Sequence, residues 1–65
     1  MTPTDFQSTL QRLGLTQAEC ARLLGVTPGA VTRWAQGARA VPGPVVRLLG
    51  LCEAMPRVVA WLGKQ

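Results

Sequence analysis

The chain has 65 residues, which is enough for one small domain and too few for a large hydrophobic core. Seven Lys and Arg against three acidic residues give a net charge of +4, which favours an anionic partner such as nucleic acid. Two cysteines without histidine exclude a four-ligand zinc site, and three carboxylates leave little for acid–base catalysis. We therefore expect a non-enzyme with no cofactor, metal or small-molecule ligand.

The polar N-terminus contains no secretory signal, and charged residues interrupt every apolar run before it could span a membrane. We expect a soluble, cytoplasmic and nucleoid-associated protein with reduced thiols and no membrane partner.

The N-terminal segment predicts a first helix beginning near Asp5. Thr4 and Gln7 have the spacing of a capping box, and Gly14 is expected to end the helix in a left-handed conformation. The apolar side chains of this helix recur at helical spacing: Phe6, Leu10 and Leu13.

Residues 17–36 predict two short helices joined by a tight turn. Thr16 and Glu19 form a second capping-box pattern, and Gly25 is the stop signal of the helix that they open. Thr27 and Pro28 then suit the N-cap and first position of a third helix, which ends before Gly37. Together these signals predict a helix-turn-helix, a unit that places its second helix in the DNA major groove.

At about 100° per residue, the third helix separates a polar arc from an apolar one. The arc expected to face DNA bases contains Pro28, Gly29, Thr32, Arg33 and Gln36. Arg33 is the favoured base reader because a guanidinium can bridge guanine O6 and N7, although a phosphate contact is the alternative. Trp34 falls on the opposite arc, so we interpret it as a core residue rather than a platform for single-stranded nucleic acid.

Phosphate contacts are expected from residues that border the third helix: Gln17, Thr27 and Arg39. We interpret most of the remaining cations as ordinary surface charges: Arg12, Arg22, Arg47, Arg57 and Lys64. Cys20 and Cys52 fall among apolar neighbours and are interpreted as buried structural thiols.

Residues 38–44 form a proline- and glycine-rich connection to a fourth helix that begins at Pro44. Its inner face is expected to contain Val45, Leu48, Leu49 and Cys52. Pro56 marks a break before a short last helix over residues 57–62. We expect residues 44–62 to complete the core and to form a homodimer interface from Leu51, Met55, Val58, Trp61 and Leu62. The alternatives are that the last stripe folds back as core, or lies on a partner protein or a membrane surface.

The segment LTQAECARLLGVTPGAVTRWAQGAR resembles the Cro and phage-repressor-like helix-turn-helix family, also called the XRE family. The resemblance covers roughly residues 6–51, and its strongest marks are Thr16-Gln17, Ala21, Leu24-Gly25-Val26, Val31, Trp34 and Gly37.

The resemblance implies an all-α, compact five-helix lambda-repressor-like fold over residues 1–65. It also implies a homodimeric regulator of double-stranded DNA, often carried by phages, mobile elements or toxin–antitoxin operons. It places Gln17 at a phosphate, Thr27 at the helix cap, and the side chains of the polar arc at the bases. Many relatives have hydrogen-bonding side chains where this chain has Pro28-Gly29, which implies a specificity resting on Arg33, Gln36 and DNA shape. An interaction module that uses the apolar C-terminal surface is the alternative function.

Overall fold

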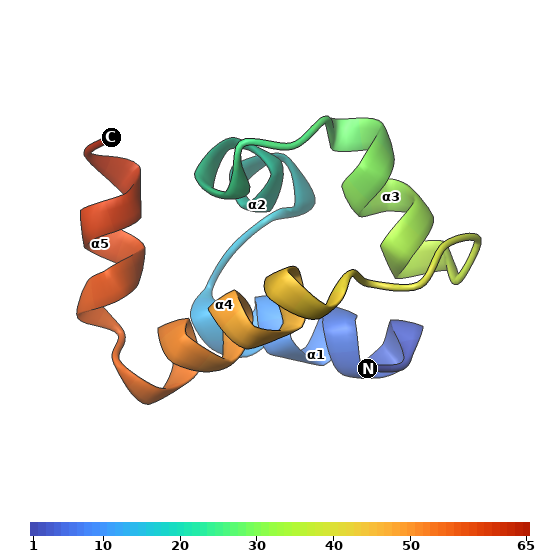
Figure 1. The fold of residues 1–65 in the computed structure, drawn as a ribbon, viewed down its shortest axis with the longest axis horizontal. Coiled ribbons are helices and arrows are strands. Elements are labelled where there is room, and N and C mark those ends of the chain that lie inside the picture. Colours follow the sequence, from blue (N-terminus) through green and yellow to red (C-terminus); the bar gives the residue numbers. More distant parts are fainter.

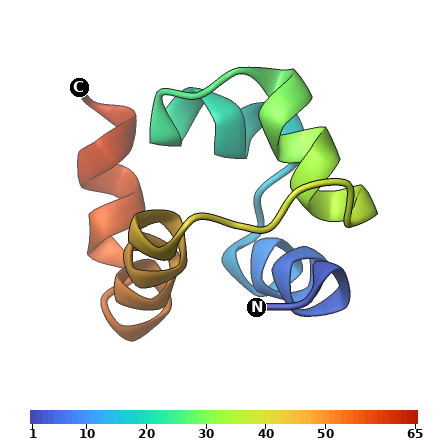
Figure 2. The same cartoon turned by 45° about the vertical axis from the view of Figure 1, so that its right-hand side comes forward.

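The computed structural model describes all 65 residues and contains five α-helices and no strand. The helices are α1 (Pro3–Leu13), α2 (Gln17–Leu24), α3 (Pro28–Gln36), α4 (Gly43–Ala54) and α5 (Arg57–Gly63). Helices α1 and α4 pack together on one side, α2 and α3 pack together across from them, and α5 stands at one end (Figures 1 and 2). This arrangement confirms the predicted all-α, five-helix fold.

Helix α1 begins two residues before the predicted start, so the capping box predicted at Thr4 and Gln7 is wrong. The Thr2 hydroxyl accepts from the Asp5 amide at 3.0 Å, and the Asp5 carboxylate accepts from the Thr2 amide at 3.3 Å. Pro3 takes the first helical position, where its missing N–H costs nothing. The Asp5 carboxylate lies near the positive end of the helix dipole, which favours the start at Pro3 over the later start that Gln7 would cap.

Helices α2 and α3 have the predicted boundaries because local signals define each end. The Thr16 hydroxyl accepts from the Glu19 amide at 3.1 Å, and the Thr27 hydroxyl accepts from the Ala30 amide at 3.2 Å. Gly25 ends α2 at φ 70°, a left-handed conformation that disfavours residues with a Cβ. Helices α2 and α3 pack against each other on either side of this turn.

The core lies where α1, α2, α3 and α4 meet. Its fully buried members are Phe6, Leu10, Cys20, Ala21, Val31, Trp34, Ala35 and Leu49. Trp34 packs edge-to-face on Phe6, with ring centroids 5.9 Å apart and planes at 86°, which is a favoured aromatic geometry. Trp34 is only 5% exposed, so its interpretation as a core residue is confirmed.

Helix α4 begins at Gly43, one residue before the predicted start, and Pro42 provides no side-chain cap. On its inner face Leu49 and Cys52 are buried, whereas Val45 and Leu48 are half-buried. Helix α5 packs on α2 and α4 but has no fully buried residue. The last predicted element is therefore present, with most of its surface left open.

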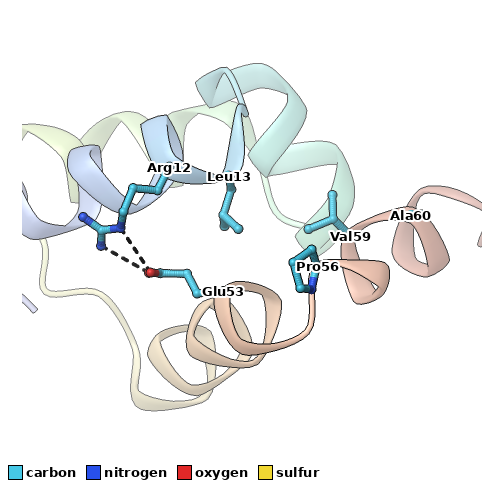
Figure 3. Close-up of a pocket in the computed structure, with 6 residues that line it drawn as sticks. All are labelled: Arg12, Leu13, Glu53, Pro56, Val59 and Ala60. Carbon is cyan, nitrogen blue, oxygen red and sulfur yellow. Dashed lines mark hydrogen bonds and ion pairs between the residues drawn. The ribbon is translucent and has the colours of Figure 1, made fainter.

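Arg12 joins α1 to α4, so it is an exception among the five cations of which most were interpreted as ordinary surface charges. Its Nε donates to Glu53 at 3.1 Å, its Nη2 donates to the other carboxylate oxygen at 3.2 Å, and Nη2 also donates to Thr9 Oγ1 at 3.1 Å. Figure 3 shows this pair beside a groove that Leu13, Pro56, Val59 and Ala60 also line. Such bidentate geometry between distant residues is not visible in a sequence pattern.

Candidate nucleic-acid interface

Helix α3 has one face in the core and one face open to solvent. Val31, Trp34 and Ala35 are buried, so the helix cannot rotate without losing its packing on Phe6 and the rest of the core. Four residues of the predicted base-facing arc are exposed, namely Pro28, Gly29, Arg33 and Gln36. The fifth, Thr32, is half-buried. The fold thus brings the whole predicted arc together on the free side of α3.

Thr32 connects the start of α2 with α3. Its hydroxyl oxygen lies 3.0 Å from the Pro28 carbonyl oxygen and 3.4 Å from Gln17 Oε1. The single hydroxyl proton can be donated to only one of them at a time, and the shorter distance favours Pro28. In either state Gln17 lies beside the exposed arc, with its amide nitrogen left available as a donor.

Arg39 is held directly beyond the end of α3. Its backbone amide donates to the Arg33 carbonyl at 3.3 Å, and the Ala38 amide donates to the same oxygen at 2.9 Å. These bonds form around Gly37, which caps α3 at φ 79°. The exposed Arg39 side chain therefore starts from a fixed backbone position next to the exposed arc.

Gln7 hydrogen-bonds to the C-terminal end of α3, and the sequence analysis did not predict this contact. Its side-chain Nε2 donates to the Ala35 carbonyl at 2.7 Å, across 28 residues of sequence. Carbonyls in the last turn of a helix lack partners within the helix, so this bond satisfies one of them. A glutamine on a helix carries no signal in sequence that would predict such a partner.

All three carboxylate side chains are engaged within the fold. Asp5 and Glu19 bond to the N-caps of α1 and α2, and these bonds lower the pKa of each carboxyl below its usual range. The hydrogen bond from Arg12 lowers the pKa of Glu53 in the same direction. The salt bridge of the structure joins Arg12 to Glu53, so the exposed Arg33 and Arg39 have no carboxylate partner.

The thiols contribute no surface chemistry. Cys20 is fully buried, and burial raises the pKa of its thiol to about 11, in agreement with the interpretation of a structural thiol. Cys52 is also buried, and its pKa is raised by the same cause. No cluster of three potential metal ligands is present, and none of the helices is long and apolar enough to cross a membrane.

A helix pair that packs across a glycine turn and exposes a polar arc with an arginine on its second member is the architecture of a helix-turn-helix DNA-binding domain. The helix-turn-helix family model matches residues 7–49, more than half of the chain. The protein belongs to this family, that of the Cro-like and XRE-type DNA-binding transcription regulators. A search of curated proteins and a search of solved structures found no significant match.

Proposed function

We propose that the protein is a small homodimeric repressor that binds an inverted-repeat operator near a promoter and represses by occluding RNA polymerase. The observation that carries this proposal is the exposed arc of α3, where Arg33, together with Arg39 just beyond the end of the helix, has no carboxylate partner. Phage, mobile-element or antitoxin-type control of its own operon fits a regulator of this size. Such a protein acts on the DNA of the nucleoid.

In this proposal α3 lies in the major groove with Arg33 as the principal base contact. Pro28, Gly29, Thr32 and Gln36 then face the bases beside it. A bidentate arginine–guanine contact is worth about 1–3 kcal/mol of discrimination against other bases. Arg33→Ala should therefore weaken operator binding by about that amount and leave binding to random DNA almost unchanged, as measured by fluorescence anisotropy. An equal loss on both DNAs would reduce Arg33 to a phosphate contact.

The phosphate contacts proposed for Gln17 and Thr27 follow from their places at helix starts. The Thr27 oxygen accepts from the Ala30 amide, so its hydroxyl proton remains free for a phosphate oxygen. The Gln17 amide nitrogen has the same freedom, since only its Oε1 lies near Thr32. Gln17→Ala should lower the affinity for operator and for random DNA by similar factors. A change in base preference instead would assign Gln17 to the bases.

The homodimer proposal rests on the apolar surface left at the C-terminal end. Leu51, Met55 and Trp61 are 44%, 41% and 59% exposed, and Val58 and Leu62 are half-buried. Two-fold pairing through this surface leaves each α3 toward the far end of its domain. The longest extent of the domain is 30 Å, so each α3 can lie about 17 Å from the two-fold axis, which gives the spacing of about 34 Å between successive major grooves.

The proposed dimer interface contains two positively charged residues, Arg57 and Lys64. A shallow groove of about 440 Å³ on the outer side of α5 is lined by Met55, Arg57, Val58, Ala60, Trp61 and Lys64. A second copy has no free carboxylate side chain to offer these two cations, because all three are engaged. Self-association should therefore strengthen as salt screens the cations, whereas DNA binding weakens with salt.

Sedimentation velocity at micromolar concentration tests the dimer. The wild type should be dimeric and Trp61→Asp should be a folded monomer, while Gln11→Asp, an exposed change on α1, should stay dimeric. A monomeric wild type would refute the homodimer.

The same basic, apolar groove favours a second function, an interaction module for an acidic partner protein. A wild type that is monomeric and does not shift its own upstream DNA at low salt would favour that module.

Genomic footprinting tests the regulatory role, because it names the bound site and the controlled gene together. We expect protection of an inverted repeat overlapping a promoter, including the promoter of the protein's own operon. Sites far from any promoter would contradict repression by occlusion.

A further inference from the structure

Gly29 leaves the first turn of α3 without a side chain on its exposed face. A Cβ built at this position would meet only the Arg33 Nη1 atom at 3.6 Å and the Thr27 Oγ1 atom at 4.0 Å. Neither neighbour belongs to the core or to the backbone. The space over Gly29 is therefore surface space, and the group that occupies it is the guanidinium of Arg33.

The position of this guanidinium follows from helix geometry. Side chains of an α-helix lean toward its N-terminus, so a residue covers the turn before its own, four positions back. Arg33 stands four positions after Gly29 and has no carboxylate to draw it elsewhere. Its planar group consequently lies over the first turn, where a side chain from residue 29 would otherwise stand.

We propose that Gly29 determines base specificity by leaving the first turn of α3 open to Arg33, so that the Arg33 guanidinium reads a guanine in place of any side chain from residue 29. This inference rests on the proposed DNA-binding function. The fork of a guanidinium matches O6 and N7 of guanine, which selects that base over the other three. Gly29 is thus a positioning residue that acts through Arg33 and makes no base contact of its own.

Substitution at Gly29 is structurally permitted, so the idea can be tested in a folded protein. Gly29 is helical and is absent from the three glycines with positive φ, which are Gly14, Gly25 and Gly37. An added Cβ meets its nearest neighbour at an ordinary contact distance. Gly29→Ala therefore serves as a control that keeps the arginine in place, whereas Gly29→Gln fills the space and displaces it.

Gly50 provides a matched control on another helix. It is exposed and lies within α4, and a Cβ there would meet nothing within 4 Å. Gly50→Gln therefore adds the same side chain to a helical glycine away from the exposed arc, and should leave base preference unchanged.

The experiment is selection of bound duplexes from a randomised pool, followed by competition binding on single-base variants of the selected site. The wild type, Gly29→Ala and Gly50→Gln should all prefer the same guanine in each half-site by roughly tenfold or more. Gly29→Gln should lose this preference, and Arg33→Ala should remove it equally in the wild-type and Gly29→Ala backgrounds.

The outcomes separate two failures. A wild type that enriches no sequence would overturn the proposed function itself. A wild type that enriches a guanine-containing site, together with a Gly29→Gln variant that keeps the same guanine with the same strength, would overturn only the role of Gly29.

Discussion

Gly37 caps the C-terminal end of α3 beside the first residue of α1, Pro3. Its φ is 79°, and a Cβ added there would lie 2.9 Å from Cγ of Pro3, closer than such atoms approach in proteins. Pro3 cannot move aside easily, because its ring is fixed to the backbone at the first position of α1. We therefore predict that Gly37→Ala is more damaging than an alanine at either of the other left-handed glycines.

The magnitude has two parts. A left-handed conformation costs a residue with a Cβ about 1–2 kcal/mol, and this cost applies equally at Gly14 and Gly25, where nothing lies within 4 Å of the added atom. Crowding against Pro3 adds about 1–3 kcal/mol for Gly37 alone. The total of about 2–5 kcal/mol is a large part of the stability of so small a domain, which is typically about 3–10 kcal/mol.

Urea unfolding followed by circular dichroism at fixed protein concentration measures these differences. Gly37→Ala should lose at least about 1 kcal/mol more than Gly14→Ala. Adding Pro3→Ala should recover part of the loss in the Gly37→Ala background but none in the wild type, which is the signature of a direct contact. Equal losses for Gly37→Ala and Gly14→Ala would refute the close approach.

Three further outcomes are expected. Arg39→Ala should reduce the slope of log affinity against log salt by about one unit, whereas Lys64→Ala, just after α5, should not. An unchanged slope in Arg39→Ala would remove Arg39 from the interface. The carboxyl pKa of Glu53 is lowered in the fold, so its contribution to stability is full above about pH 4–5 and is lost as pH falls through the folded pKa. Glu53→Gln should therefore flatten the fall of the melting temperature in acid, and an identical acid profile would contradict a role for the Arg12 pair. The Cys20 thiol should resist alkylation at neutral pH until the protein unfolds, as detected by mass spectrometry; rapid labelling of the native protein would contradict its burial.

The sequence predicted most accurately the helix ends and buried faces that neighbouring residues determine. Thr16, Gly25, Thr27 and Gly37 are local start and stop signals, and α2 and α3 begin and end where these residues predict. The helical period likewise placed Trp34 in the core. The arc of α3 was predictable for the same reason, since a helix with one buried face exposes the other.

The sequence predicted least well what distant residues decide together. Gln7 binds the Ala35 carbonyl and Arg12 binds Glu53, yet neither residue differs in type or spacing from ordinary polar positions on a helix. The start of α1 was misplaced because two overlapping patterns compete there, and Pro3 together with Asp5 favours the earlier one. The two long-range contacts depend on packing geometry that no short pattern encodes, whereas the start of α1 is decided by local residues.

The placement of α5 separates its exposed surface from that of α3. Helix α3 and helix α5 lie on opposite sides of the molecule in both views, and α2 contacts each of them (Figures 1 and 2). A molecule seated on α5 therefore leaves the face of α3 unobstructed. In the proposed dimer, Trp61→Asp would change the assembly without altering any of the proposed base-facing side chains of α3. The surface proposed for assembly and the surface proposed for base contact therefore share no residue.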